Sequence, residues 1–416
     1  MTTNTLNLSK TQEKAIKSED KVCAHNYKPL PVVLERGKGA WLWDIDGNKY
    51  LDMMSAYSAV SHGHSHPRLL KAFTDQAAKL AICSRAFHTN TLAKFLDKIC
   101  DLSGLDMALP MNTGAEAVET AIKAARRWGY QVKGIAENQA EIITAEGNFH
   151  GRTTTIISFA TDEGTRKDFG PFTPGFKTVP FGDAKALESA ITPNTCAFLV
   201  EPMQGEAGII VPPAGWLKEV AAICKKNNVL LILDEIQAGL GRTGKMFAFE
   251  HDGIKPDGLI LGKALGGGMM PVSCFVAKRE VMELFKPGSH GSTFGGNPLA
   301  AAVGYEALVT LEDEKLVERS AELGAYLKEQ LEALDSPIVK EVRGRGLWIG
   351  FEIDGSYISG HDLCKKLMAR GILAKETHET TVRLAPPLMI SKEEIDWALG
   401  ELRDVLSTIT AGSKAA

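Results

Sequence analysis

The sequence predicts an α/β fold in which a mostly parallel central sheet carries helices on both faces, with a smaller α+β domain beside it. Two observations support this prediction. The 416 residues exceed what one simple core accommodates, so we expect one large and one small domain. The middle of the chain also alternates short apolar runs with amphipathic stretches, which is typical of buried parallel strands and their covering helices.

The apolar runs are the predicted strands of the central sheet. They are largely apolar on consecutive positions, as strands covered on both faces are, and they are Glu141–Ala145, Ala197–Val200, Val229–Leu233, Leu259–Leu261 and Val272–Val276. The amphipathic stretch Gly215–Lys226 lies between two of them and predicts a helix. This order of elements implies parallel pairing, and we expect the large domain to span residues 56–310.

After about residue 310 the pattern changes to that of an α+β domain. Lys315–Asp335 predicts a long amphipathic helix, and Gly346–Ile353 predicts a strand. Ser391 is followed three residues later by Glu394, a capping box that predicts the start of the last helix. We expect the small domain to span residues 311–416, of which 411–416 form a frayed tail.

The N-terminal segment, residues 1–55, is expected to pack with the small domain. Trp41–Asp44 and Lys49–Asp52 flank the turn Asp46-Gly47-Asn48 and predict a β-hairpin. The segment therefore contributes strands to a domain whose other elements lie at the far end of the chain.

Composition and charge narrow the class of protein. Apolar residues make up 44% and charged residues 24%, as in an ordinary globular enzyme. The net charge is −4 and like charges form no block, so we expect neither a nucleic-acid nor a membrane partner. The N-terminus lacks the apolar stretch of a signal peptide, and it has no arginine before Arg36, unlike a mitochondrial presequence. The seven cysteines are scattered and never form CxxC, which predicts reduced thiols and a cytoplasmic enzyme.

Two residues that follow neighbouring strands carry the strongest chemical signal. Asp234 ends one apolar run, and Lys263 follows the next one, ahead of the glycines at 266–268. Because ligands of open α/β sheets bind beyond the carboxyl ends of strands, both side chains are expected in one crevice. Pyridoxal phosphate (PLP) needs both groups, a lysine that forms a Schiff base and a carboxylate at the pyridine nitrogen. The alternative is a surface lysine and a capping aspartate, which the pairing of the two disfavours.

A phosphate site is predicted at the start of a helix. Thr113 and Glu116 form a capping box, and Gly114 allows the backbone to approach a ligand closely. The free N–H groups of the first turn and the helix dipole favour a phosphate dianion there. An ordinary capped helix is the alternative.

The run His62-Gly63-His64-Ser65-His66-Pro67 has three histidines at alternate positions, a spacing that a metal site could use. No cysteine or other fourth ligand accompanies it, and its glycine and proline make it a loop. We interpret the run as structural and predict no metal. The glycines at 266–268 lack the GxGxxG spacing of a dinucleotide site.

Six motifs occur in the order found in the class III PLP-dependent aminotransferases, and the chain resembles that family from about Tyr27 to Arg383. The motifs are Asn112–Ala117, Gly147–Thr153, Glu201–Glu206, Asp234–Gln237, Gly262-Lys263 and Gly291–Pro298. The resemblance implies the type I fold of PLP enzymes and a homodimer. Within the family, the branch that converts ornithine is most similar, at His25–Pro31, Ser55–Val60, Ser84–Phe87 and Arg383–Leu388.

The resemblance implies a ping-pong reaction. The terminal amine of L-ornithine passes to PLP and then to 2-oxoglutarate, giving glutamate 5-semialdehyde and glutamate. Related alternatives are an N-acetylornithine or 4-aminobutyrate aminotransferase. An aminomutase of the same fold would need no 2-oxoglutarate, and a non-catalytic relative is disfavoured by the intact Lys263 and Asp234.

The resemblance also assigns the cofactor residues. Lys263 is the Schiff-base lysine and proton shuttle, and Asp234 is the partner of the pyridine nitrogen. The remaining expected contacts are Phe149 and Ile236 on the two ring faces, Gln237 on the 3′-hydroxyl, Gly114 and Ala115 on the phosphate, and Ser292 and Thr293 on the phosphate of the other subunit. His150 departs from the branch, where tryptophan is common, and is expected to affect the packing of the side from which substrate arrives.

The substrates pose a physical problem that two arginines solve. Arg152 and Arg383 match the two carboxylates of glutamate, because a guanidinium binds a carboxylate bidentately. With ornithine bound, an unpaired buried arginine is costly, and Glu206 is expected to neutralise Arg383. Tyr27 and Tyr57 are expected to seat the α-amino and carboxylate ends of ornithine, and a structural ion pair is the alternative for each arginine.

Overall fold

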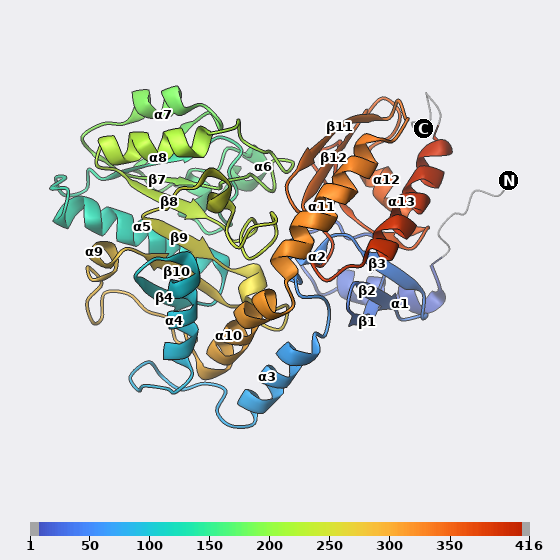
Figure 1. Cartoon of the computed structure of the whole chain (residues 1–416), viewed down its shortest axis with the longest axis horizontal. Helices are drawn as coiled ribbons and strands as arrows, with labels where there is room; N and C mark the ends of the chain where they lie inside the picture. Colours follow the sequence, from blue (N-terminus) through green and yellow to red (C-terminus); the bar gives the residue numbers. More distant parts are fainter. Residues whose placement is uncertain (1–7, 410–416) are drawn as a thin grey trace.

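The computed structural model describes residues 8–409, and it shows two lobes side by side (Figure 1). The larger lobe is built on a seven-stranded sheet in the order β4-β10-β9-β8-β7-β5-β6. Its strands are β4 (Met107–Met111), β5 (Glu141–Ala145), β6 (Phe176–Val179), β7 (Thr195–Val200), β8 (Leu230–Asp234), β9 (Gly258–Leu261) and β10 (Ser273–Ala277). The strands β6, β5, β7, β8 and β9 pair in parallel, and β10 runs antiparallel to β9 and β4, so the predicted mostly parallel α/β sheet is confirmed.

Helices cover both faces of this sheet (Figure 1). Alternate residues of a strand point to opposite faces. Ile232 of β8 accordingly packs in the core cluster that includes α5 (Gly114–Gln131), and Leu231 packs in the one that includes α8 (Trp216–Lys226). Other helices of this lobe are α3 (Pro67–Ala77), α4 (Leu92–Ser103), α6 (Glu163–Arg166), α7 (Ala184–Ala190), α9 (Arg279–Met282) and α10 (Pro298–Asp313).

The smaller lobe contains two four-stranded sheets and, from the C-terminal part of the described chain, three helices. One sheet has the order β11-β12-β15-β14 and is antiparallel, with β11 (Val339–Gly344), β12 (Ile349–Ile353), β14 (Lys375–Thr377) and β15 (Thr381–Leu384). The helices are α11 (Leu316–Glu332), α12 (Gly360–Met368) and α13 (Lys392–Ser407). The expected helix at 315–335 is thus α11, and Ser391 caps α13 with the predicted capping box.

The N-terminal segment joins this lobe through the second sheet. After α1 (Lys10–Asp20), the strands β1 (Leu34–Lys38), β2 (Trp41–Asp44) and β3 (Lys49–Asp52) form an antiparallel meander that contains the predicted hairpin. The fourth strand is β13 (Ile372–Leu373), which pairs with β3 in parallel. The boundaries expected at residues 55 and 310 stay a prediction, and the expected tail at 411–416 lies outside the described residues.

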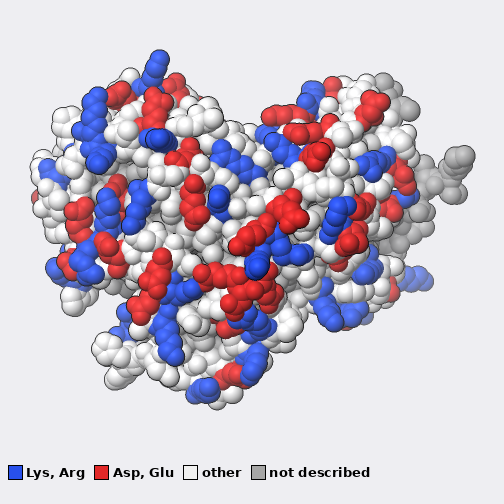
Figure 2. Space-filling view, viewed as in Figure 1, with Lys and Arg blue, Asp and Glu red and all other residues white. Residues whose placement is uncertain are grey.

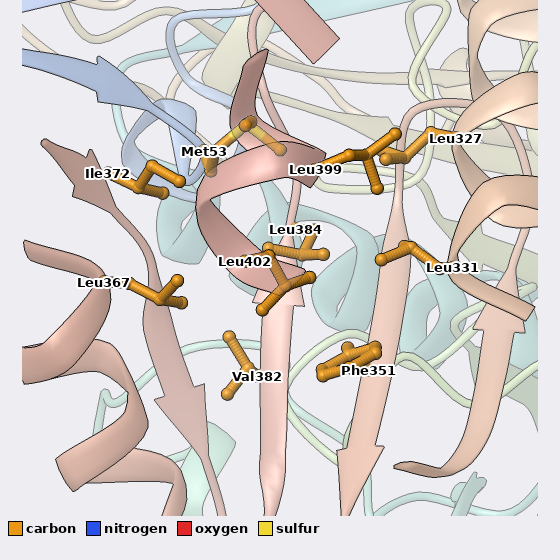
Figure 3. A pocket seen from close by; sticks show the side chains of 11 residues that line it. Met53, Leu327, Leu331, Phe351, Leu367, Ile372, Val382, Leu384, Leu399 and Leu402 are labelled. Carbon is orange, nitrogen blue, oxygen red and sulfur yellow. The ribbon is translucent and has the colours of Figure 1, made fainter. Parts of the chain in front are cut away.

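Figure 3 shows the apolar core of the small lobe. Met53, which follows β3, packs there with side chains from β12, β15 and the three helices around a gap of about 20 Å³. The gap is lined by apolar side chains, so it is an imperfection of the core and not a ligand site. Met53 thereby joins the N-terminal segment to the C-terminal elements.

Acidic and basic side chains are interspersed over the face of the molecule shown in Figure 2. Among residues 8–409, no helix combines the length and the apolar character needed to cross a membrane.

Candidate active site

A cavity of about 140 Å³ opens at the carboxyl ends of the sheet strands. Asp234 ends β8, Lys263 follows β9, and the start of α5 follows β4. The remaining lining comes from the segments after β5, β7 and β8, and the full set is Gly114, Ala115, Phe149, His150, Gly151, Glu201, Met203, Asp234, Ile236, Gln237, Ala238 and Lys263. The structure therefore brings the predicted Asp234, Lys263 and helix start into one site, as the topology of an open α/β sheet predicts.

Lys263 has an unusual conformation. Its φ is 45°, in the left-handed region, and such strain tends to persist at functional sites. Within residues 8–409, its amine has no hydrogen bond or ion pair. Burial lowers the pKa of Lys263, against the opposing charges of Glu206, Asp234 and Glu201. A lysine with a lowered pKa is more often neutral, which is the form that attacks a carbonyl carbon.

Asp234 is buried and held from two sides. Its Oδ1 accepts a hydrogen bond from the Ile236 N–H at 3.0 Å, and its Oδ2 lies 2.7 Å from His150 Nδ1. Burial lowers the pKa of His150, but the hydrogen bond to Asp234 and the charges of Asp234 and Glu201 outweigh it, so the pKa is raised. The contact with Asp234 thus favours the protonated form of the imidazole.

The side chain of His150 is buried against Asp234 and also lines the cavity. Its effect on the side from which substrate arrives stays a prediction. The position is therefore coupled to the acidic group of the site, and sequence reasoning missed this because the contact joins residues 84 positions apart.

Glu201 is a second residue whose role sequence reasoning missed. Its Oε2 accepts from the Phe149 N–H at 3.0 Å, and its Oε1 accepts from the Gly205 N–H at 3.2 Å. Burial raises the pKa of Glu201 to about 7. The carboxylate therefore fixes both Phe149 and the loop that carries Glu206. Its position directly after the apolar run 197–200, like that of Asp234 after its own run, was the available signal.

The start of α5 has the expected capping box. Thr113 accepts from the Glu116 N–H, and Glu116 accepts from the Thr113 N–H at 2.8 Å. The first N–H groups of a helix have no intrahelical partner, so those of Gly114 and Ala115 are suited to an anion. A Cβ added at Gly114 would lie 2.9 Å from Ile236 Cδ1, so the end of that side chain would have to shift to accept any larger residue.

Ser292 and Thr293 do not line this cavity. They lie in a second, open hollow with Ile82, Cys83, Ser84 and Arg85. Ser292 Oγ accepts from Asn112 Nδ2 at 2.8 Å, and Thr293 is exposed. A single chain therefore leaves these two predicted phosphate contacts outside its own site.

Arg383 on β15 makes a sparse set of contacts for a buried arginine. Its Nη1 donates to Glu206 Oε1 at 2.8 Å, and its Nη2 donates to the Glu376 carbonyl at 3.3 Å. Its Nε is buried and has no partner among the described residues. The guanidinium also lies 4.7 Å from the centre of the Tyr57 ring. Glu206 thus holds Arg383 by one contact, and N–H groups of the guanidinium remain for a second carboxylate.

The backbone around Tyr57 is strained. Ser55, Ala56, Tyr57 and Ser58, labelled α2 in Figure 1, have φ values of 49°, 45°, 59° and 75°, which makes this a left-handed turn. Each such residue costs about 1–2 kcal/mol. The Asp52 carboxylate accepts from the N–H groups of Met54 and Ser55 and supports the turn. The turn aims Tyr57 at Arg383.

Arg152 has no carboxylate within 4.0 Å among residues 8–409. Its guanidinium lies 5.4 Å from the centre of the Phe149 ring and 5.9 Å from that of Tyr27. A structural ion pair, the alternative considered for Arg152, is therefore not found within the described chain. The cation remains available beside Phe149, and Tyr27 is 64% exposed.

The three histidines of the run 62–66 each have another partner. His62 Nε2 bonds with the Ala307 carbonyl, His64 with Asp52 and His66 with Glu314. Among residues 8–409, no group of three or more histidine, cysteine or acidic residues is placed to hold a metal ion.

Comparison with known proteins agrees with the geometry. The family Aminotransferase class-III matches residues 22–406. The ornithine aminotransferase of Bacillus subtilis (strain 168) is 58% identical over 399 residues, covering 96% of this chain and 98% of the relative. The ornithine aminotransferase of Brevibacillus brevis is 56% identical over 399 residues, covering 96% and 99%.

Solved structures show the same similarity. Ornithine aminotransferase from Toxoplasma gondii superposes with a TM-score of 0.94 at 44% identity, covering 96% of this chain and 95% of that chain. Acetylornithine aminotransferase from Elizabethkingia anophelis gives a TM-score of 0.87 at 47% identity, covering 95% and 99%. The chain therefore belongs to the class III aminotransferases.

Proposed function

We propose that the cavity holds PLP and that the enzyme moves the terminal amine of L-ornithine to 2-oxoglutarate, giving glutamate 5-semialdehyde and glutamate in a ping-pong reaction. The observation that carries the proposal is the Glu206–Arg383 contact beside Lys263. In this contact Glu206 can neutralise Arg383 while ornithine is bound, and Arg383 can bind a carboxylate of glutamate in the other half-reaction. The 54–58% identity to relatives named ornithine aminotransferase supports the same substrate.

The residues of the cavity fit this cofactor. The unpaired amine of Lys263 suits a covalent link to an aldehyde, and the glycine at 114 leaves room for a phosphate at the start of α5. When bound, PLP acts as an electron sink for the carbon that carries the amine.

Each side chain then has a defined task. Asp234 holds a proton at the pyridine nitrogen, supported by His150, and Lys263 moves a proton at the reacting carbon of the substrate. Phe149 and Ile236 would cover the two faces of the bound ring, and Gln237 would bind its 3′-hydroxyl. Gly114 and Ala115 would bind the phosphate.

The two arginines divide the substrate carboxylates. Arg152 binds the carboxylate remote from the reacting carbon in both half-reactions, with Tyr27 and Tyr57 at the α-amino and carboxylate ends of ornithine. Arg383 binds the α-carboxylate of glutamate after Glu206 moves away. With ornithine, Glu206 stays on Arg383, so no free cation draws the α-carboxylate toward the reacting carbon.

We further propose a homodimer in which Ser292 and Thr293 complete the phosphate site of the partner subunit. The hollow that holds them is flanked by exposed apolar side chains, among them Phe87 at 69% exposure and Phe294 at 56%. Such a face favours association with a second copy of the chain. We place the enzyme in the cytoplasm, because its seven cysteines are unbridged.

N-acetylornithine is the second candidate donor, because an acetylornithine aminotransferase is 47% identical to this chain. Free ornithine is favoured by the polar ring of Tyr57 beside Arg383, since an acetylated α-nitrogen carries no charge to seat.

A panel of amine donors tests the assignment. Ornithine, N-acetylornithine and 4-aminobutyrate are each supplied with 2-oxoglutarate, and the semialdehyde is trapped with an aromatic amine. We expect ornithine to have the highest kcat/KM by at least about tenfold. Conversion of many equivalents of a donor per active site without 2-oxoglutarate would indicate an aminomutase, and a preference for N-acetylornithine would overturn the proposed substrate.

The cofactor assignment has a separate test. Reduction of the yellow protein with borohydride should fix a pyridoxyl group on Lys263, as mapped by peptide mass spectrometry. A label on another lysine would show that the site is wrongly assigned.

A further inference from the structure

The loop that carries Glu206 belongs to the large lobe but lies on a sheet of the small one. Its ends are held by the large lobe, where Gln204 N–H and Ile210 N–H exchange hydrogen bonds with each other's carbonyls and Gln204 Nε2 donates to the Glu146 carbonyl. Its tip, residues 205–208, meets the sheet β11-β12-β15-β14. Two small-lobe side chains bind its backbone there.

Thr377 binds the first of these backbone groups. Its Oγ1 donates to the Glu206 carbonyl at 2.5 Å, and its side chain is buried. Thr377 lies on β14 opposite Thr381 of β15, two residues from Arg383. The hydroxyl that holds the Glu206 backbone and the guanidinium that meets its carboxylate are therefore carried by paired strands.

Arg343 binds the second backbone group of the loop, the Gly208 carbonyl. Its Nε donates to the Gly208 carbonyl at 2.8 Å, and its Nη2 is fixed by Glu352 at 3.0 Å and by Thr381 Oγ1 at 3.0 Å. Because both ends of the guanidinium are occupied, Arg343 is a rigid support for the loop. A Cβ added at Gly208 would lie 3.0 Å from Arg343 Nη2, which shows how closely the two approach.

The register of the sheet explains why the loop sits at this place. Arg343, Gly350 and Arg383 are direct neighbours across β11, β12 and β15. A Cβ at Gly350 would lie 2.8 Å from the Gly208 carbonyl oxygen, so the missing side chain leaves the gap that the loop occupies. The loop is thus seated between two arginines, one structural and one facing the substrate.

We propose that Thr377 and Arg343 are positioning residues that set the selectivity of the site between ornithine and glutamate. They fix the backbone of Glu206 where its carboxylate meets Arg383, so release of Arg383 requires only the Glu206 side chain to move. Without these bonds the loop backbone drifts, the Glu206–Arg383 contact weakens, and Arg383 becomes a freer cation. This inference rests on the proposed function, in which that contact separates the two half-reactions.

The central variant is Thr377→Val, which removes the hydroxyl and keeps the shape. We expect kcat/KM for ornithine to fall about fivefold, the effect of one lost hydrogen bond, while kcat/KM for glutamate stays constant or rises. The share of ornithine that loses its α-amine, measured as 2-oxo-5-aminovalerate, should rise by a similar factor. Thr377→Ser should restore wild-type values. Arg343→Lys, which keeps the charge but loses the Nε donor, should act in the same direction.

Thr408→Val is the matched control. Thr408 lies in the same lobe at the end of α13, and its hydroxyl donates to the Val405 carbonyl, away from the loop, Arg343 and Glu352. We expect wild-type selectivity from it. Melting temperatures of all variants establish that they are folded.

A double variant separates positioning from a general structural effect. If Thr377 acts through Glu206, adding Thr377→Val to Glu206→Ala should leave the product ratio of Glu206→Ala unchanged. If Thr377→Val lowers kcat/KM for ornithine in the Glu206→Ala enzyme by the same factor as in the wild type, the proposal is overturned. A Thr377→Val enzyme that is folded and has the wild-type product ratio would overturn it as well.

Binding of a non-reactive dicarboxylate gives a readout that does not depend on turnover. Glutarate must displace Glu206 to reach both arginines, so its affinity, measured by calorimetry, should rise about fivefold in Thr377→Val. An unchanged affinity contradicts the proposal. Failure of the wild-type enzyme to convert ornithine would instead remove the proposed substrate, and the glutarate result would still decide how Thr377 acts.

Discussion

Glu206 holds Arg383 through a single contact on a side chain that keeps 28% of its surface exposed, while Arg383 keeps 5%. The arrangement is asymmetric, because the carboxylate can leave and the guanidinium cannot. An arginine left alone in a closed site carries a penalty of several kcal/mol. The carboxylate of glutamate can replace that of Glu206 without this penalty.

Glu206→Ala should therefore change which amine of ornithine reacts. Freed permanently, Arg383 draws the α-carboxylate of ornithine, and 2-oxo-5-aminovalerate should rise at least severalfold relative to glutamate semialdehyde. Glutamate should react at least as well as with the wild-type enzyme. Chromatographic product analysis decides this, and an unchanged product ratio would leave Glu206 a structural partner only.

Glu201 gives a pH dependence whose sign follows from its burial. Its pKa is raised from 4.5 to about 7, so the folded protein binds its proton more tightly than the unfolded chain does. Protonated Glu201 therefore adds about 3 kcal/mol to the free energy of unfolding at low pH. This contribution is lost as the pH rises from about 4.5 through 7.

The variant Glu201→Gln removes this titration. We expect the melting temperature of the wild type to fall relative to that of the variant between pH 5 and pH 8, as measured by calorimetry. Parallel curves for the two proteins would contradict the raised pKa. Glu146→Gln, a change at a nearby glutamate, is the control for altered charge alone.

At the scale of single elements, the start of α5 is the tightest part of the site. The helix begins immediately behind Ile236, and the glycine at 114 is what allows this. If PLP is held as proposed, the N–H groups and the dipole of this helix start would stabilise its phosphate.

Gly114→Ala should weaken cofactor binding by up to about tenfold, because its methyl group would lie 2.9 Å from Ile236 Cδ1 and would force that side chain to shift. Fluorescence titration of the cofactor-free protein with PLP measures the affinity. Gly400→Ala in α13 is the matched control, since a Cβ there meets nothing within 4 Å. Equal affinities in both variants would contradict the assigned phosphate site.

The elements differ in how far the sequence predicts them. Local patterns are sufficient for the strand ends at Asp234, for the capping boxes at Thr113 and Ser391 and for α11, because each depends on neighbouring residues. The contact of His150 with Asp234 and that of Thr377 with the Glu206 loop join distant segments, and no short pattern encodes them. The left-handed turn at 55–58 contains no glycine, the residue that would have predicted positive φ values there.

At the scale of the whole molecule, the site depends on both lobes and on the proposed partner. The large lobe supplies Asp234 and Lys263, the small lobe supplies Arg383, and the proposed partner supplies Thr293. Substitutions in the exposed apolar face around the second hollow therefore test whether the proposed dimer forms there.

Phe87→Asp combined with Phe294→Asp should separate the proposed dimer, because two charges would be buried in an apolar contact. Sedimentation should then show monomers, and PLP should bind about tenfold more weakly for lack of the partner's phosphate contacts. Val132→Asp, at another exposed apolar residue, should leave the assembly intact. A double variant that remains dimeric would move the interface elsewhere.

The parallel pairing of β3 with β13 has a consequence for biosynthesis. Leu51 pairs with Ile372, about 320 positions later in the chain. At about 5–20 residues per second, a ribosome needs on the order of tens of seconds to make the intervening chain. During that time β1–β3 have no C-terminal sheet or helices to pack on, while the strands of the large sheet emerge in sequence. The strands β1–β3 are thus made before the large sheet but buried after it, and within the described chain they are the part that a chaperone has most time to meet.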